Sequence, residues 1–103
     1  MKGFQLTFST LTSRKHPDGE RLSDWLMHQA EELGIVGVTL LRAAQGVGRD
    51  GKVHSQTFFE LADEPLEIVM NVNEKQCDTL LAYLKEEKLG LFYTKIAIEF
   101  GTL

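Results

Sequence analysis

The chain has 103 residues, of which 43% are hydrophobic and 25% charged, and its formal net charge is −4. These values are typical of a soluble globular protein and predict one domain over residues 1–103, with no membrane-spanning segment. The acidic balance argues against a nucleic-acid partner, which would require a basic surface. A single cysteine excludes an intramolecular disulfide and fits a reducing compartment, so we expect a cytoplasmic protein.

The first part of the chain predicts a strand followed by a helix. Apolar and polar residues alternate over residues 4–9, as expected for a strand with one buried face. A polar loop follows, in which we expect Asp18 to cap the next helix. The apolar residues between 22 and 33 recur at helical spacing, and Gly34 supplies the expected end of that helix.

The rest of the chain contains two predicted strands around one long excursion. Period-two alternation marks residues 36–41 and 66–73, and an intervening segment of roughly 20 residues is usually functional in a compact domain. Residues 73–76 form an expected capping box for a second amphipathic helix, which ends near Gly90. Alternation then returns over residues 92–100 and predicts the last strand.

This order of elements predicts an α+β fold of the ferredoxin-like type. Strand, helix, strand, strand, helix and strand form a βαββαβ sandwich, with a four-stranded antiparallel sheet and two helices on one face. The other sheet face mixes polar and apolar residues, so we expect it to pack against other subunits of an oligomer. We place on that face Gln5, Thr7, Thr39, Leu41, Val69, Asn71, Tyr93 and Ala97.

The excursion, at about residues 44–65, carries three glycines with dinucleotide-binding spacing. Gly46, Gly48 and Gly51 match Gly-x-Gly-x-x-Gly. A Rossmann site requires a helix directly after these glycines, so that the helix N-terminus can hold the pyrophosphate. Here a strand is predicted instead, and we therefore reject the Rossmann interpretation.

Two interpretations of the glycine-rich segment remain. Its backbone N–H groups can form an anion-binding nest, to which Arg49 and Lys52 add positive charge near a phosphate. Alternatively, Asp50 and Gly51 form an ordinary hairpin turn, and the glycines only permit a positive φ. Spacing alone favours the hairpin turn.

No catalytic constellation is predicted from the sequence. His54 and Ser55 are neighbours in a strand, so their side chains point to opposite faces, and no acidic residue is placed to orient the imidazole. The chain lacks a paired nucleophile and base, so we expect no enzyme. Its histidines at 16, 28 and 54 lack zinc-site spacing, and we expect no metal site within one chain. Cys77 lies on the inward stripe of the second helix and is expected in the core.

Aromatic residues in the excursion suggest contacts with another protein. Phe58 and Phe59 place one ring on each side of a strand, so that one ring can face a partner. Together with His54, they are our candidates for residues of a loop that a partner protein recognises.

Several short blocks of sequence occur in a characteristic order along the chain. They are Gly37-Val38-Thr39-Leu40-Leu41-Arg42, Gly46-Val47-Gly48, Val53-His54-Ser55, Phe59-Glu60-Leu61, Asp63-x-Pro65-Leu66, and Gly90-Leu91 with Lys95. In this order they resemble the PII-like proteins catalogued as domain of unknown function 190. More distantly, the chain is similar to the PII nitrogen-regulatory proteins, in which a strand leads into Gly-Phe-Gly-Arg at the base of a long loop.

The resemblance implies a homotrimer with small-molecule sites in the clefts between subunits. In PII proteins ATP or ADP occupies these clefts, so ATP, ADP and AMP are the candidate effectors here. The resemblance also implies a regulator that acts through its loop on a partner protein, such as a membrane transporter or an enzyme. The effector residues that we assign, with Lys52 added for its charge, are Thr39, Gly46, Gly48, Arg49, Lys52, Gly90 and Lys95.

The chain departs from the PII pattern at three places. Asp50 stands where PII proteins have a glutamine, the excursion contains no tyrosine, and the chain ends without phosphate-binding arginines. We therefore expect a small anionic effector, with an adenine nucleotide as one candidate. The alternative is a CutA-like protein of divalent metal binding or tolerance, which shares the trimeric architecture and would use His54 between subunits.

Overall fold

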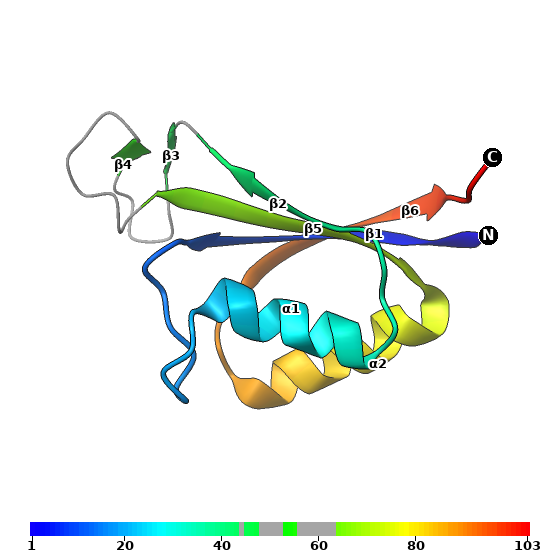
Figure 1. Cartoon of the computed structure of the whole chain (residues 1–103), viewed down its shortest axis with the longest axis horizontal. Helices are drawn as coiled ribbons and strands as arrows, with labels where there is room; N and C mark the ends of the chain where they lie inside the picture. The colour runs from blue at the N-terminus through cyan, green and yellow to red at the C-terminus, as the bar shows by residue number, and fades with distance from the viewer. Residues whose placement is uncertain (44, 48–52, 56–63) are drawn as a thin grey trace.

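The computed structural model describes residues 1–43, 45–47, 53–55 and 64–103 (Figure 1). The elements in chain order are β1 (Lys2–Leu11), α1 (Leu22–Glu32), β2 (Val38–Arg42), β3 (Gln45–Val47), β4 (Val53–Ser55), β5 (Pro65–Asn73), α2 (Glu74–Glu87) and β6 (Phe92–Glu99). Four strands form one antiparallel sheet in the order β2-β5-β1-β6, and β3 pairs with β4 in a separate small sheet. The predicted ferredoxin-like fold is confirmed.

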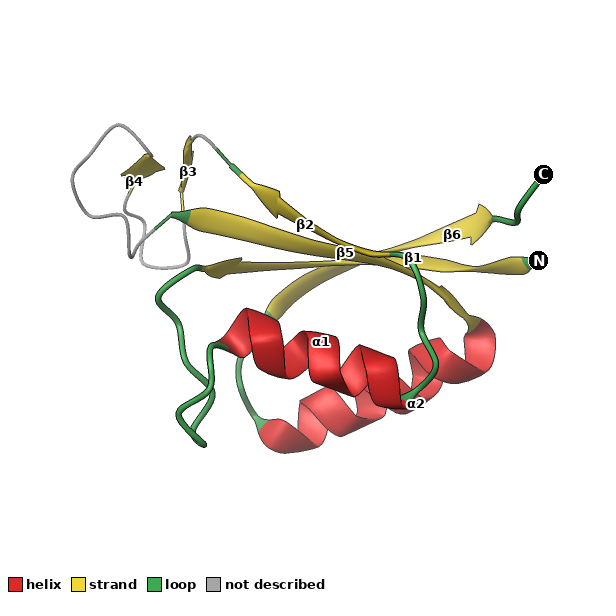
Figure 2. Ribbon diagram, viewed as in Figure 1, coloured by secondary structure: helices red, strands yellow, loops and turns green. Residues whose placement is uncertain are grey.

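Both helices cover the same face of the four-stranded sheet (Figure 2). The alternating residues of β1 and β5 meet the apolar stripes of the helices in one hydrophobic core, where each fully buried Leu, Ile, Val, Met or Phe side chain contributes about 1.5–3 kcal/mol. Its members are Leu6, Phe8, Leu22, Trp25, Leu26, Ala30, Ile35, Ile68, Met70, Val72, Cys77 and Leu80.

Helix α2 begins with the capping box that the sequence predicts. Asn73 Oδ1 accepts a hydrogen bond from the Gln76 backbone N–H at 2.7 Å, and the Asn73 backbone N–H donates to Gln76 Oε1 at 3.0 Å. Gln76 also donates from its side-chain amide to the carbonyl of Leu33 at 3.2 Å. The start of α2 is therefore tied to the end of α1.

Helix α1 ends as expected but begins differently. Gly34 follows the helix with φ of +72° and supplies its end, which confirms that prediction. The prediction that Asp18 caps α1 is wrong, because the N-cap residue is Arg21, which has no side-chain capping bond. Asp18 Oδ1 instead accepts from the Glu20 backbone N–H at 2.8 Å. Asp18 thus closes a local turn before the helix begins.

The strand register places the side chains of β6 on faces opposite to those predicted. Phe4, Leu6 and Phe8 of β1 face the helices, and their partners in β6 are Ala97, Lys95 and Tyr93 respectively. The rings of Phe8 and Tyr93 lie 6.3 Å apart, which agrees with a common face. Counting apolar residues misassigned β6 because Tyr93 and Lys95 at a sheet edge can cover the core with their apolar parts while their polar ends reach water.

The open sheet face is consequently more apolar than the sequence suggested. Its β6 residues are Phe92, Thr94, Ile96 and Ile98 rather than Tyr93 and Ala97. Phe92 and Ile96 are 55% and 56% exposed, and Leu41 of β2 is 49% exposed. On the same face, the Gln5 side-chain amide donates to Asn71 Oδ1 at 3.2 Å. Polar residues along β1 and β5 thus separate apolar residues on the two edge strands.

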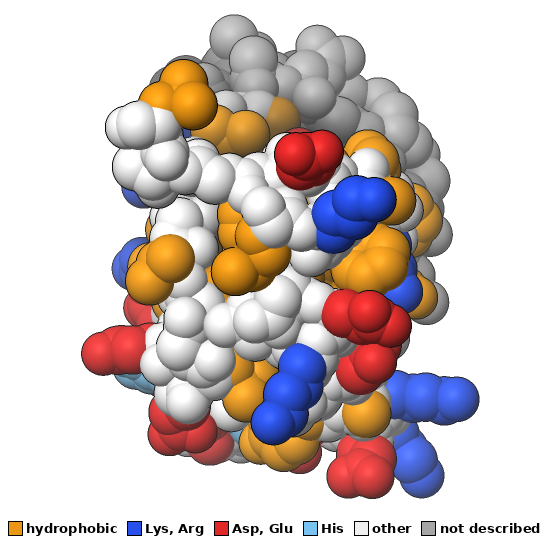
Figure 3. Space-filling view, turned by 90° about the vertical axis from the view of Figure 1, so that its right-hand side faces the viewer, with side chains coloured by type: hydrophobic (Ala, Val, Ile, Leu, Met, Phe, Trp, Pro, Cys, Tyr) orange, Lys and Arg blue, Asp and Glu red, His pale blue; other side chains and the backbone are white. Residues whose placement is uncertain are grey.

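The surface carries charges of both signs. Seen from the end at which both termini lie, acidic and basic side chains are interspersed with apolar ones (Figure 3). Within the described ranges, no helix is both long and apolar enough to span a membrane.

Candidate functional site

The two ends of the excursion are held together at one end of the sheet. The backbone N–H of Ala43 donates to the Pro65 carbonyl at 3.0 Å, and that of Thr12 donates to the Glu64 carbonyl at 2.9 Å. Arg42 Nη1 also lies 3.6 Å from Glu64 Oε2. Glu64 is only 8% exposed, so this ion pair is formed between a buried carboxylate and an exposed guanidinium. The base of the excursion is therefore held in place by backbone hydrogen bonds and an ion pair.

The glycine-rich segment is bracketed by paired strands. Gly46 of β3 lies opposite His54 of β4 in an antiparallel pair. A strand therefore follows the glycines, as predicted, and the helix that a dinucleotide fingerprint needs does not occur at residues 53–55. The other predicted residues of the excursion lie outside the described ranges: Gly48, Arg49, Lys52, Phe58 and Phe59.

Thr39 occupies the edge strand that leads into the excursion. It pairs with Val69 of β5, and its side chain is exposed on the open face of the sheet. Because β2 is an edge strand, Thr39 lies at one edge of the four-stranded sheet, and the chain continues from this edge to Gly46 in the separate small sheet. This edge can be reached by a second chain.

Gly90 and Lys95 lie at the opposite edge. Gly90 adopts a positive φ of 63° in the turn between α2 and β6. Lys95 stands in edge strand β6 opposite Leu6, with its Nζ 4.2 Å from the centroid of the Phe4 ring. Strands β5 and β1 separate β6 from β2. One chain therefore does not bring Lys95 beside Thr39 and Gly46.

The turn that contains Gly90 and the base of the excursion nevertheless lie near the same end of the sheet. Phe92, two residues after Gly90, pairs with Ser9 near the end of β1. At the other edge, Arg42 pairs with Leu66 near the start of β5. The turn before β6 and the base of the excursion thus lie at one end of the sheet, on opposite sides of it.

Cys77 lies in the core, as predicted. Its side chain is fully buried, and burial raises the pKa of the thiol, while the nearby Lys95 ammonium acts in the opposite direction. A buried neutral thiol is a poor nucleophile and a poor metal ligand. No group of three or more histidine, cysteine or carboxylate side chains suitable for a metal ion occurs among the described residues.

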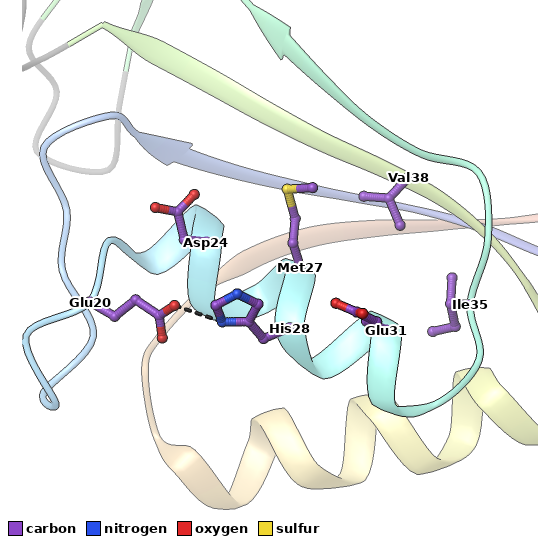
Figure 4. A pocket seen from close by; sticks show the side chains of 7 residues that line it. All are labelled: Glu20, Asp24, Met27, His28, Glu31, Ile35 and Val38. Atoms are coloured by element: carbon purple, nitrogen blue, oxygen red, sulfur yellow. Dashed lines mark ion pairs between the residues drawn. The ribbon is translucent and has the colours of Figure 1, made fainter.

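A surface pocket of about 470 Å³ lies between α1 and the start of β2 (Figure 4). Three carboxylates line it, from Glu20, Asp24 and Glu31, and His28 Nδ1 lies 2.7 Å from Glu20 Oε1. Excess negative charge repels an anion, so this pocket does not suit a phosphate-bearing effector.

One cluster, centred on His16, was not predicted from the sequence. The His16 ring stacks on Trp25 with the ring centroids 4.3 Å apart, and its Nε2 lies 2.8 Å from Glu87 Oε1. His16 and Glu87 are 71 residues apart, so no local pattern could have paired them. The only local signal was the sequence Lys15-His16-Pro17-Asp18-Gly19, which predicts a loop.

A protein-family model matches most of the chain, over residues 6–94. Its description is DUF190, Uncharacterized ACR. The chain belongs to the DUF190 family. This confirms the resemblance that the short sequence blocks indicated. No curated protein matches the chain in sequence.

Solved structures share the fold of this DUF190 protein. A PII-like signaling protein from Thermus thermophilus is 16% identical, with a TM-score of 0.66, and the match covers 95% of this chain and 90% of that one. CPII from Thiomonas intermedia, a nitrogen regulatory PII-like protein bound to ADP, AMP and bicarbonate, is 16% identical with a TM-score of 0.63, covering 95% and 89%. Its apo form also matches, at 15% identity and a TM-score of 0.57, covering 95% and 92%. The DUF190 protein therefore has the PII-like fold.

Proposed function

We propose that this DUF190 protein is a non-enzymatic PII-like regulator, which binds a small anionic effector between subunits of a homotrimer. The effector class includes the adenine nucleotides ADP, AMP and ATP. The observation that carries this proposal is the placement of the candidate residues at two opposite edges of one sheet. A single chain cannot close a site from both edges, whereas two adjacent subunits can.

One edge supplies the anion-binding part of the proposed site. Thr39 is exposed on β2, and Gly46 follows in β3 at the base of the excursion. Arg49 and Lys52 follow in sequence, and we assign them, with the backbone of Gly48, to the phosphate or carboxylate of the effector. Charge-assisted hydrogen bonds of this kind are stronger than neutral ones.

The opposite edge of the neighbouring subunit supplies the rest of the proposed site. Gly90 stands in the turn before β6 with a backbone conformation that favours glycine, so the chain can approach a ligand closely there. Lys95 follows on β6 and adds a positive charge. Because Lys95 lies against Phe4 in the free chain, effector contact requires its flexible stem to change rotamer.

The open sheet face supplies the proposed subunit contacts. Phe92, Ile96 and Leu41 expose large apolar side chains there, and burying them removes apolar area from water at about 25 cal/mol per Å². A face that lies in the interior of an assembly also explains why its edge strands carry apolar residues. These subunit contacts would bring the two edges of adjacent chains together.

The similar solved structures support an adenine nucleotide as the effector to test first. CPII is bound to ADP, AMP and bicarbonate in one structure and to ADP and bicarbonate in another. We further propose that effector binding changes the order of the excursion, residues 44–65. A partner protein would then recognise the excursion through His54, Phe58 and Phe59. A ligand shifts such an equilibrium only through its differential affinity for the two states.

Titration calorimetry with ADP, AMP and ATP, each with and without bicarbonate, tests the proposal. The expected result for the unaltered protein is saturable binding with one site per subunit. Replacing Arg49 and Lys52 together by alanine should weaken binding at least about tenfold, because each charge-assisted hydrogen bond contributes about 1.5–3 kcal/mol.

The matched control is Lys75→Ala, which removes an exposed lysine from the first turn of α2. That turn follows Asn73, which pairs with Gly3 at the other end of the sheet. The control should bind as the unaltered protein does. Equal affinity of the control and the Arg49 and Lys52 double variant would overturn the assignment of these two residues.

A further inference from the structure

His16 joins three elements of the fold, and none of its contacts among the described residues is with the excursion. It stands in the loop of residues 12–21, which connects β1 to α1. Its Nε2 lies 2.8 Å from Glu87 Oε1 at the end of α2, and its ring stacks on Trp25 of α1 at 4.3 Å and 14°. The loop and both helices therefore meet at one imidazole.

The two ring nitrogens of His16 have different partners. With its proton on Nε2, the neutral ring donates to Glu87 and accepts at Nδ1 the backbone N–H of Asp18, at 3.1 Å. A second proton on Nδ1 would remove that backbone bond. The same nitrogen, however, already lies 3.2 Å from Asp18 Oδ1. Protonation therefore exchanges one neutral hydrogen bond for ion pairs with two carboxylates.

The surroundings of His16 favour its charged form. The hydrogen bond to Glu87 raises the pKa of His16 above 6.5, burial of the ring opposes the rise, and Asp18 adds to it. The stacked indole of Trp25, which itself stacks on Tyr83 of α2 at 5.9 Å, also attracts a cation to its face. Of the nearby carboxylates of the loop, Glu20 pairs with His28 instead.

The same loop is tied to the turn before β6. The Arg14 guanidinium donates to the carbonyl of Leu89, which directly precedes Gly90. The backbone N–H of Leu22, the first residue of α1, donates to the Arg14 carbonyl at 2.9 Å, and that of His16 donates to the Glu20 carbonyl at 2.8 Å. These backbone bonds fix Arg14 and His16 relative to each other. The same loop therefore contacts both Glu87, through His16, and the turn after α2, through Arg14.

We propose that His16 is a proton-operated latch, which fastens the loop of residues 12–21 to the end of α2 and holds the turn at residues 88–91 more firmly when the imidazole is protonated. The latch is a property of the folded chain and does not depend on the effector proposal. The stability that the latch contributes is complete below pH 6.5, the usual pKa of histidine. It decreases as the pH rises through the higher pKa of His16 in the folded protein.

Amide hydrogen exchange between pH 5.5 and 8.5, corrected for intrinsic rates, tests the latch. Protection of the amides of residues 89–91 should decrease as His16 loses its proton, which NMR of the ring follows directly. In His16→Gln this pH-dependent decrease should be lost, because the amide side chain can still bond to Glu87 but cannot take up a proton. The single tryptophan, Trp25, reports the same event by fluorescence.

Two further variants make the test independent of the folding of His16→Gln. Glu87→Gln keeps an acceptor for His16 but removes the charge, so the decrease in protection should move to lower pH. His28→Gln removes the histidine of the exposed Glu20 pair and should leave the decrease unchanged. Titration of His16 without any change in the exchange of residues 89–91 would overturn the latch, as would an unshifted decrease in Glu87→Gln.

Discussion

The Lys95 ammonium lies 4.2 Å from the centroid of the Phe4 ring, on the face of the sheet that the helices cover. The contact agrees with the strand register, which pairs Lys95 with Leu6. That register directs Ile96 and Phe92 to the open face, where both are more than half exposed. The same register thus produces both the Lys95 ammonium over the Phe4 ring and the apolar surface that we assign to subunit contacts.

Replacement of Lys95 by methionine should lower the free energy of unfolding by about 0.5–1 kcal/mol, the usual contribution of a cation over an aromatic ring at an exposed site. Methionine keeps the length of the stem and removes the charge. Urea unfolding measures the difference, and Lys95→Arg, which keeps a cation over Phe4, is the control. A methionine variant as stable as the arginine variant would show that the contact contributes nothing.

Gly3→Ala should destabilise the fold by about 1–3 kcal/mol, the usual cost of overpacking. A Cβ at Gly3 would collide with the backbone carbonyl oxygen of Val72 and lie 2.8 Å from the Phe100 ring. Gly101→Ala is the matched control, since a Cβ there meets nothing within 4 Å. Thermal unfolding compares the two variants. Equal midpoints would contradict the close approach of β1 to β5 at Gly3.

Asn73→Ala should cost about 1 kcal/mol, because it removes the side-chain acceptor of the capping box at the start of α2. The Gln76 backbone N–H would then lose its partner. Asn73→Ser keeps a capping oxygen and should recover most of the loss. Chemical unfolding followed by circular dichroism gives both values. No difference between alanine and serine would mean that the cap is unimportant for stability.

Ile96→Asp should dissociate the proposed trimer without unfolding the subunit. Ile96 is 56% exposed in the single chain, so a carboxylate there remains hydrated in a monomer, whereas in an assembly it would be buried without a partner. Light scattering coupled to gel filtration measures the mass. Thr79→Asp, on the exposed side of α2, is the control and should keep the mass of the unaltered protein. The open-face assignment fails if both variants have the same mass.

Local patterns predicted most of the fold. Alternation in β1 and β5, the helical spacing of Leu22 and Leu26, and the capping box at Asn73 each depend on neighbours within a few residues, and all three are present in the structure. Family resemblance added the PII-like fold, which no single block of residues determines.

The features that the sequence did not predict depend on how distant parts of the chain lie together in the folded protein. The face of β6 could not be read from apolar residues, because an edge strand places Tyr93 and Lys95 over the core and leaves Ile96 open. The contact of His16 with Glu87 joins residues far apart in the chain, and only the folded structure brings them together. The effector residues of the excursion likewise follow from resemblance and charge.

Mixed assemblies test most directly whether the effector site lies between subunits. Arg49→Ala and Lys95→Ala proteins are unfolded together, refolded as a mixture, and titrated with ADP beside each variant alone. We expect each variant alone to bind weakly and the mixture to regain tight binding at about a quarter of its sites, where intact edges of two chains meet by chance. A mixture that binds no better than the variants alone, when the unaltered protein binds ADP tightly, would contradict a site shared between subunits.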